Sequence, residues 1–217
     1  RHGETEANEK GIYCGGKHDS PLTGEGKNQA ALLGKALNNY YKFSGNFIVC
    51  SRRGRTIETA NGISQFLEPK PSILTIEGLH EMDLGEWCGK TAEENQKLFP
   101  KECAEWKNNV LKPSFRFPGG ESMTEARKRM MNCFNVIQKL WRSRGEKNDD
   151  IIIVAHSGTN MIILAEILRV QMGTFAYRSI RQDNTCLNII NYCESSKWRP
   201  KIQIVLVNST HHLDMKF

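Results

Sequence analysis

Two histidines stand beside residues that could bind an anion. The sequence opens Arg1-His2-Gly3, which places a cation next to an imidazole and then a glycine that lets backbone come close to a ligand. Taken alone, this is a weak indication, because any such pair could lie on the surface by accident. His156 lies where a strongly apolar run ends and a helix is expected to begin. Ligands of open parallel sheets bind outside the carboxyl ends of strands, so His156 is the stronger candidate for a functional histidine.

The segment Ser51-x-x-x-Arg55-x-x-x-Thr59-Ala60 is typical of a helix start that binds phosphate. The first turn of a helix presents unpaired N–H groups and a partial positive charge. One turn along, the guanidinium of Arg55 can make a bidentate contact with phosphate oxygens. The alternative, which the pattern leaves open, is a surface arginine on an amphipathic helix.

A loop with three carboxylates offers a general acid. Glu81, Asp83 and Glu86 precede Trp87 in a segment that follows an expected strand. One of them could exchange a proton with a substrate. Their chemistry alone does not choose among the three.

These residues need a scaffold, and the alternation of apolar runs with helical segments predicts an α/β fold with a mostly parallel sheet. Thr23 is a good N-cap for a first helix. Apolar residues at spacings of three and four predict its buried face: Ala30, Leu33, Leu37 and Tyr40. Strands are expected at 47–50, 73–76 and 150–155, with helices at 53–67 and 158–168. The run at 150–155 predicts an interior strand that is buried on both faces.

Residues 78–120 have a looser pattern, in which two capping boxes flank a break at 117–120. Thr91 with Glu94 predicts a short helix, and Ser122 with Glu125 predicts a long one to about Trp141. The inner stripe of the long helix is predicted as Met123, Ala126, Met130, Cys133, Ile137 and Leu140. Strands at 186–192 and 202–207 are expected to close the sheet.

Composition and charge exclude several classes of protein. With 217 residues and 39% hydrophobic content, one domain, alone or with a modest insertion, can bury a core. The net charge of +6 attracts anions, but a soluble protein with a small excess of lysine carries it equally well. No basic run alternates with aromatics, so nucleic acid is not expected as a partner. A small phosphorylated metabolite is preferred as the partner only because of the motifs. No apolar stretch reaches the roughly 20 residues of a membrane span, so no membrane partner is expected.

The seven cysteines favour a reducing, cytoplasmic location. Their odd number and the lack of a Cys-x-x-Cys pair argue against a disulfide framework and against a zinc site. Cys50 and Cys133 lie in apolar surroundings and are expected to be small core residues.

Taken together and in this order, the motifs resemble the histidine phosphatase superfamily, also called phosphoglycerate mutase-like. The four pieces are Arg1-His2-Gly3, Ser51-x-x-x-Arg55-x-x-x-Thr59-Ala60, Glu81 before Gly85-x-Trp87-x-Gly89, and Ala155-His156-Ser157-Gly158. Further matches are Asn8, Asp19-x-Pro21-Leu22-Thr23, Pro118-Gly119-Gly120-Glu121-Ser122 and the closing Asn208-x-Thr210-x-His212-Leu213. The resemblance covers nearly the whole chain.

The resemblance implies a three-layer α/β/α sandwich, formed by one domain over residues 1–217 with a helical or loop insertion at about 78–121. It assigns His2 as a nucleophile that forms a phosphohistidine and Glu81 as the proton donor. It also assigns a phosphate-binding set, with Ser51 and Gly158 as supports: Arg1, Asn8, Arg55, His156 and Ser157. No metal or other cofactor is implied. Family members have an apolar strand directly before Arg-His-Gly, so we expect that the native chain has one before Arg1.

The substrate is the least determined part of the resemblance. The compact stretch from Glu81 to His156 favours hydrolysis over phosphoglycerate mutase activity. Residues 181–190 are similar to α-ribazole phosphatases, which makes α-ribazole 5'-phosphate one candidate substrate beside phosphoserine and sugar bisphosphates. A non-catalytic domain that binds phosphorylated ligands is an alternative, but such domains typically lose the nucleophile or a phosphate-binding residue.

Other basic residues and the oligomeric state stay open. Five cations could extend the anion site or form a solvated rim: Lys17, Arg52, Arg53, Arg178 and Arg181. His211-His212 is better explained by the closing motif than by a metal site. The sequence does not decide between a monomer and a homodimer.

Overall fold

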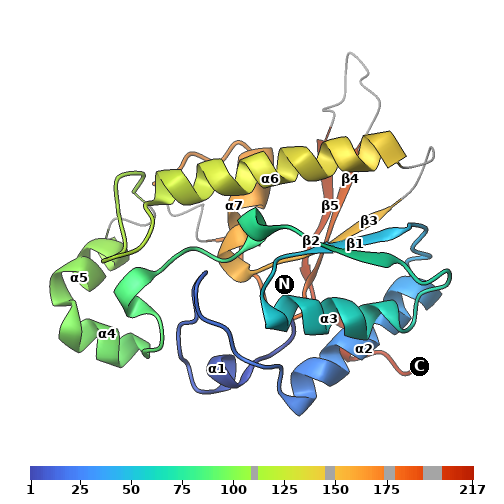
Figure 1. The fold of residues 1–217 in the computed structure, drawn as a ribbon, viewed down its shortest axis with the longest axis horizontal. Helices are drawn as coiled ribbons and strands as arrows, with labels where there is room; N and C mark the ends of the chain where they lie inside the picture. The colour runs from blue at the N-terminus through green and yellow to red at the C-terminus, as the bar shows by residue number, and fades with distance from the viewer. Residues whose placement is uncertain (109–111, 145–149, 174–178, 193–201) are drawn as a thin grey trace.

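Three parallel strands form the central sheet of the protein (Figure 1). The computed structural model describes residues 1–108, 112–144, 150–173, 179–192 and 202–217. Strands β1 (Phe47–Cys50), β2 (Ser72–Thr75) and β3 (Ile151–Val154) lie in the order β2-β1-β3, and Phe47 of β1 stands opposite Ser72 and Ile151. Parallel strands need long crossover connections, and helices supply them here.

Helices cover both faces of this sheet, which confirms the expected three layers (Figure 1). Helices α2 (Gly24–Asn39) and α3 (Gly54–Ser64) lie on one face, and α6 (Met123–Arg144) lies on the other. Successive strand residues point to opposite faces. Ile48 and Cys50 therefore pack in a cluster with residues of α2 and α3, whereas Val49 packs against Ile137 of α6.

The expected helix starts are confirmed by their hydrogen bonds. The Thr23 hydroxyl accepts from the N–H of Gly26 at the start of α2. Thr91 and Glu94 form the reciprocal capping box of α4 (Ala92–Leu98). Ser122 and Glu125 do the same where α6 begins. Tyr40 was wrong as a buried residue: α2 ends at Asn39, so the Tyr40 side chain is 70% exposed beyond its last turn.

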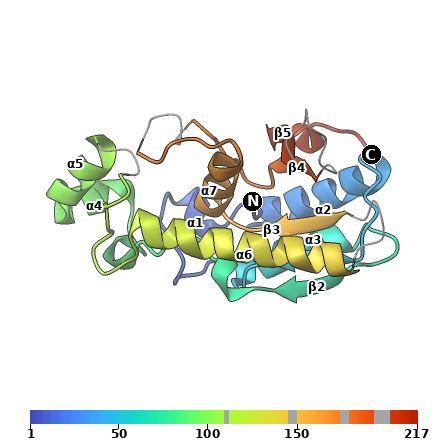
Figure 2. The same cartoon turned by 90° about the horizontal axis from the view of Figure 1, so that it is seen from above.

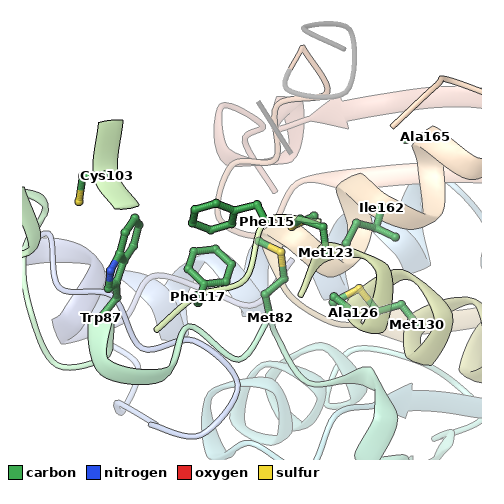
Figure 3. Packing of buried hydrophobic residues seen from close by; sticks show 10 residues of the cluster. All are labelled: Met82, Trp87, Cys103, Phe115, Phe117, Met123, Ala126, Met130, Ile162 and Ala165. Atoms are coloured by element: carbon green, nitrogen blue, oxygen red, sulfur yellow. The ribbon is translucent and has the colours of Figure 1, made fainter. Parts of the chain in front are cut away.

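The segment at about 78–121 contains short helices at one end of the molecule (Figure 2). Two 3-10 turns, η1 (Glu77–Leu79) and η2 (Gly85–Trp87), precede α4 and α5 (Pro100–Asn108). An aromatic cluster joins this end to the rest of the protein (Figure 3). In it, Trp87, Phe115 and Phe117 pack with Met123 of α6 and with Ile162 of α7 (Ser157–Ile167).

Two expectations about strands were wrong. Strands β4 (Leu187–Tyr192) and β5 (Ile202–Ser209) do not close the central sheet but pair with each other in a separate antiparallel sheet. β3 lies at an edge of the described parallel sheet, and three of its four residues are half-buried. An apolar run predicts a strand, but the neighbour that it pairs with depends on the assembled chain.

Three short elements complete the described structure. The sequence patterns did not predict α1 (Glu6–Glu9), whose capping box joins Thr5 and Asn8, nor the longer α5. A 3-10 turn, η3 (His211–Leu213), lies near the C-terminus. Among the described helices, none has both the length and the apolar composition that a membrane span requires.

Candidate active site

The backbone of His2 is held at the carboxyl end of the parallel sheet. Its N–H donates to the carbonyl of Ala155, which directly follows β3 (3.0 Å). Its carbonyl accepts from the N–H of Thr185 (3.2 Å) and from the Asn184 side-chain amide (3.1 Å). Segments far apart in the sequence thus fix the position of His2, whose side chain is buried.

The His2 ring is set up as a neutral base with a free lone pair. Its Nδ1 lies 2.8 Å from the carbonyl oxygen of Gly3. A carbonyl oxygen only accepts, so Nδ1 carries the proton and Nε2 keeps the lone pair when the ring is neutral. Burial lowers the pKa of His2 well below its usual value, and the cations Arg1 and Arg55 lower it further.

The His156 ring contacts the His2 ring and forms a hydrogen bond with a buried hydroxyl group. The two ring centroids are 5.3 Å apart, at an interplanar angle of 64°. His156 is the N-cap residue of α7, and its Nε2 lies 2.8 Å from the hydroxyl of Ser51. That hydroxyl also contacts Thr56 (2.9 Å). Burial, followed by Arg55 and His2, lowers the pKa of His156 well below its usual value, and its Nδ1 has no hydrogen-bond partner among the described residues.

Arg55 is buried at the first turn of α3, where the sequence placed it. It is 2% exposed, and it donates to the carbonyls of Gly15 (3.0 Å) and His18 (2.9 Å). It also forms an ion pair with Asp19 (2.9 Å), whose other carboxylate oxygen accepts from the N–H of Gly54. A buried charge is costly unless it has partners of opposite charge or polarity. Two carbonyls and one carboxylate therefore compensate the buried guanidinium of Arg55.

Arg1 is held by a different segment of the chain from the one that holds Arg55. Its Nη1 donates to the carbonyl of Gln182 (2.9 Å). Burial lowers the pKa of Arg1, while the Glu81 carboxylate opposes that shift. A guanidinium keeps its charge at any ordinary pH, so Arg1 remains a fixed cation beside His2.

Glu81 is the carboxylate that faces the site. One of its oxygens accepts from the N–H of Met82 (2.9 Å) and the other accepts from the N–H of Gly158 in the first turn of α7 (2.9 Å). Asp83 instead pairs with Lys17 (2.8 Å), and Glu86 is exposed. The tertiary structure therefore distinguishes three carboxylates that their chemistry alone did not.

A cavity of about 410 Å³ joins these groups. Its polar end is lined by Arg1, His2, Asn8, Arg55, Glu81 and Ser157. His156 does not line it, because this side chain is fully buried. Ser51, the buried partner of His156, does not line it either, whereas the other residues that the resemblance assigned meet around one space.

Three residues that support the site had no role predicted from sequence: Asp19, Gln182 and Asn184. The Asn184 amide donates to the Asn8 side-chain oxygen (3.1 Å), which also accepts from the N–H of Thr5 (3.2 Å). Two donors on that oxygen orient the amide, so the NH₂ group of Asn8 is turned away from them. Asp19 and Asn184 lie in segments that carried the resemblance, but their positions in sequence do not show which groups they meet.

The other basic residues do not extend this cavity. None of the four described candidates lines it. Lys17 pairs with Asp83, Arg53 with Glu77 and Arg181 with Asp183. Arg52 is exposed, and Arg178 lies outside the described residues. These contacts favour the solvated rim over an extended anion site.

The closing histidine motif has a structural setting. His212 is buried and lies 3.2 Å from the hydroxyl of Thr185, whose N–H donates to His2. In the described ranges, no group of three or more His, Cys, Asp or Glu residues is placed to hold a metal ion.

Comparisons with known proteins agree on one family and one fold. The family model described as histidine phosphatase superfamily (branch 1) matches residues 1–203. The adenosylcobalamin/alpha-ribazole phosphatase of Salmonella typhimurium is 26% identical over 215 residues, covering 93% of this chain and 97% of the relative. The probable phosphoglycerate mutase GpmB of Yersinia enterocolitica is 30% identical over 217 residues, covering 99% and 93%. The solved structure of Bacillus stearothermophilus YhfR shares the fold, with a TM-score of 0.81 and 24% identity over 98% of this chain and 96% of that one.

Acid should destabilise this site before most carboxylates titrate. The pKa values of His2 and His156 in the folded protein lie well below the 6.5 of a free imidazole. At a pH below 6.5 but above these lowered pKa values, the unfolded chain therefore binds protons that the folded protein does not. Stability is therefore present above pH 6.5 and is lost as the pH falls. We expect the free energy of unfolding in urea to drop by about 1 to 2 kcal/mol for each of the two histidines between pH 7.5 and 5.5. In His156→Asn, the part of this decrease in the free energy of unfolding that is due to His156 should disappear. A pH dependence equal to that of the wild-type protein would contradict the assignment of the decrease to the two buried histidines.

Proposed function

The chain belongs to the histidine phosphatase superfamily and is a phosphatase, and we propose that it hydrolyses small phosphomonoesters through a phosphohistidine on His2. The observation that carries this proposal is the hydrogen bond from His2 Nδ1 to the Gly3 carbonyl, which leaves Nε2 as the nucleophilic atom. That nitrogen belongs to a buried, neutral ring in a cavity that two guanidinium groups also line.

In the first step, Nε2 of His2 attacks phosphorus while the bond to the leaving oxygen breaks. Such transfers pass through a loose transition state with charge on the equatorial oxygens. Arg1 and Arg55 would stabilise this charge without a metal ion, because both are held by protein acceptors before substrate arrives. Asn8 and Ser157 line the cavity and would assist in binding these oxygens. His156 is buried outside the lining, so its contribution would go through its Nδ1, which has no hydrogen-bond partner among the described residues. The protonated Glu81 carboxyl gives its proton to the departing alkoxide.

In the second step, water attacks the phosphohistidine. Glu81, now a carboxylate, takes a proton from that water as the oxygen–phosphorus bond forms. The nitrogen–phosphorus bond breaks, and His2 is released as the neutral ring that the buried site favours. Inorganic phosphate leaves, and the second proton transfer restores Glu81 to its starting state.

Relatives named as phosphoserine phosphatases support phosphoserine as one natural substrate, and two other substrates have support as well. The segment 181–190 and the Salmonella typhimurium relative favour α-ribazole 5'-phosphate. The Yersinia enterocolitica relative favours 3-phosphoglycerate as the substrate of a mutase. Between them we favour hydrolysis of α-ribazole 5'-phosphate, because the stretch from Glu81 to His156 is compact. We further propose that the chain acts as a single domain on a small metabolite in the cytoplasm, as a monomer or homodimer.

The nucleophile can be tested with p-nitrophenyl phosphate in excess EDTA. We expect turnover by the wild-type protein with or without EDTA, and a fall of about 10³-fold or more in kcat for His2→Ala. Acid-labile phosphate should accumulate on the wild-type protein and not on the variant. A well-folded wild-type sample without turnover would favour the non-catalytic, ligand-binding alternative.

Glu81→Gln tests the proton donor through the leaving group. An alkyl alkoxide needs a proton to depart, whereas p-nitrophenolate is stable without one. We expect kcat to fall about 100-fold for an alkyl phosphate and much less for p-nitrophenyl phosphate. Asp83→Asn is the matched control, because Asp83 lies on the same loop but pairs with Lys17. Equal losses on both substrates in Glu81→Gln would argue against the assigned role.

The substrate can be tested by comparing kcat/KM across phosphometabolites. We expect phosphate release to be fastest from α-ribazole 5'-phosphate, with phosphoserine slower. Isomerisation of 3-phosphoglycerate in the presence of a bisphosphoglycerate primer should be undetectable. If isomerisation were faster than phosphate release, mutase activity would be favoured over the proposed hydrolysis.

A further inference from the structure

The cavity has a second wall, opposite in character to the phosphate-binding end. Beside the polar groups around His2, it is lined by apolar side chains, chief among them Met82, Trp87, Trp106, Phe117 and Met161. Trp106 and Phe117 have ring centroids 5.0 Å apart, and Trp87 lies 5.3 Å from Phe117 and 6.4 Å from Trp106. These three rings are the aromatic wall.

The aromatic wall is rigid because it is part of the core. Trp87 and Phe117 are almost fully buried and belong to the same cluster as Met123, Met130 and Ile162 (Figure 3). Trp106 lies half-buried on α5 and packs on this cluster from outside. Of the three rings, Trp106 is the one with part of its surface exposed, so a ligand would contact Trp106 directly while Trp87 and Phe117 hold it in place, without the cost of ordering these side chains.

The charges lining the cavity all lie near the phosphate-binding end. Among the described residues, Arg1 and Arg55 are the only cations in the lining, and the proposed function assigns both to the phosphoryl group. Lys17, Arg53 and Arg181 are paired with carboxylates outside the cavity. A second carboxylate or phosphate on the substrate would lie against apolar rings with no cation of the described residues to pair with it, which is unfavourable.

We propose that the alcohol half of the substrate carries a flat aromatic ring that packs on the aromatic wall, and that a second anionic group on it is rejected. This proposal rests on the proposed phosphatase function for the other half of the substrate. Aromatic pairs gain from offset or edge-to-face contact in addition to the area that they bury. A nucleoside with an aromatic base meets this requirement, whereas 3-phosphoglycerate does not.

The test compares 2-phenylethyl phosphate with propyl phosphate. Both release a primary alkoxide, so the chemical step is matched and only the ring differs. We expect kcat/KM to be about 10- to 100-fold higher for 2-phenylethyl phosphate, and 3-phosphoglycerate to be a poorer substrate than propyl phosphate. In Trp106→Ala the preference should fall to within about threefold, through loss on 2-phenylethyl phosphate alone. Leu98→Ala, an exposed residue on the neighbouring α4, is the control that should keep the preference.

Equal kcat/KM for the two phosphates in the wild-type protein would overturn the proposal, as would a Trp106→Ala variant that loses both equally. A second measurement needs neither a variant nor turnover: 2-phenylethylphosphonate should bind the wild-type protein at least tenfold more tightly than propylphosphonate. If neither phosphate is hydrolysed and His2 is not phosphorylated, the proposed function fails. The phosphonate affinities still decide the proposal about the aromatic wall.

Discussion

The structure depends on keeping one imidazole neutral and buried at the carboxyl end of a parallel sheet. The Gly3 carbonyl fixes the proton of His2 on Nδ1, and burial with two nearby cations keeps a second proton away. A buried ring of this kind can be aimed only if its backbone is held. The carbonyl of Ala155, directly after β3, accepts from the N–H of His2, and the Asn184 amide and the N–H of Thr185 donate to its carbonyl.

The same burial makes the flanking arginines costly, and the chain supplies compensation for each. Arg55 makes three hydrogen bonds, to the carbonyls of Gly15 and His18 and to the Asp19 carboxylate, and Arg1 donates to the carbonyl of Gln182. A buried guanidinium that is fixed in this way carries charge without needing solvent to reorganise around it. The acceptors come from loops that the sheet and helices position. The electrostatics of the site therefore depend on the fold.

Residues 78–121 contribute to both the polar and the apolar parts of the cavity. This segment contributes Glu81 at the polar end and the aromatic wall at the other end, and its aromatic cluster joins α6 and α7. Glu81 itself is held by the N–H of Gly158, at the start of α7. The position of the Glu81 carboxylate and the shape of the apolar wall therefore depend on the same packing.

The sequence by itself determined most of the local elements, and its resemblance to a family supplied the candidate residues of the site. Hydrophobic periodicity and capping residues predicted α2, α4, α6 and the parallel strands, because these features depend on near neighbours along the chain. Motif resemblance brought together His2, Arg55, Glu81 and His156. Only the tertiary structure decided that β4 and β5 form their own sheet, that His156 lies outside the cavity lining, and that Asp19 and Asn184 hold the site. These outcomes depend on contacts between residues far apart in sequence, and no local pattern encodes which distant partner a strand or a buried polar group will meet.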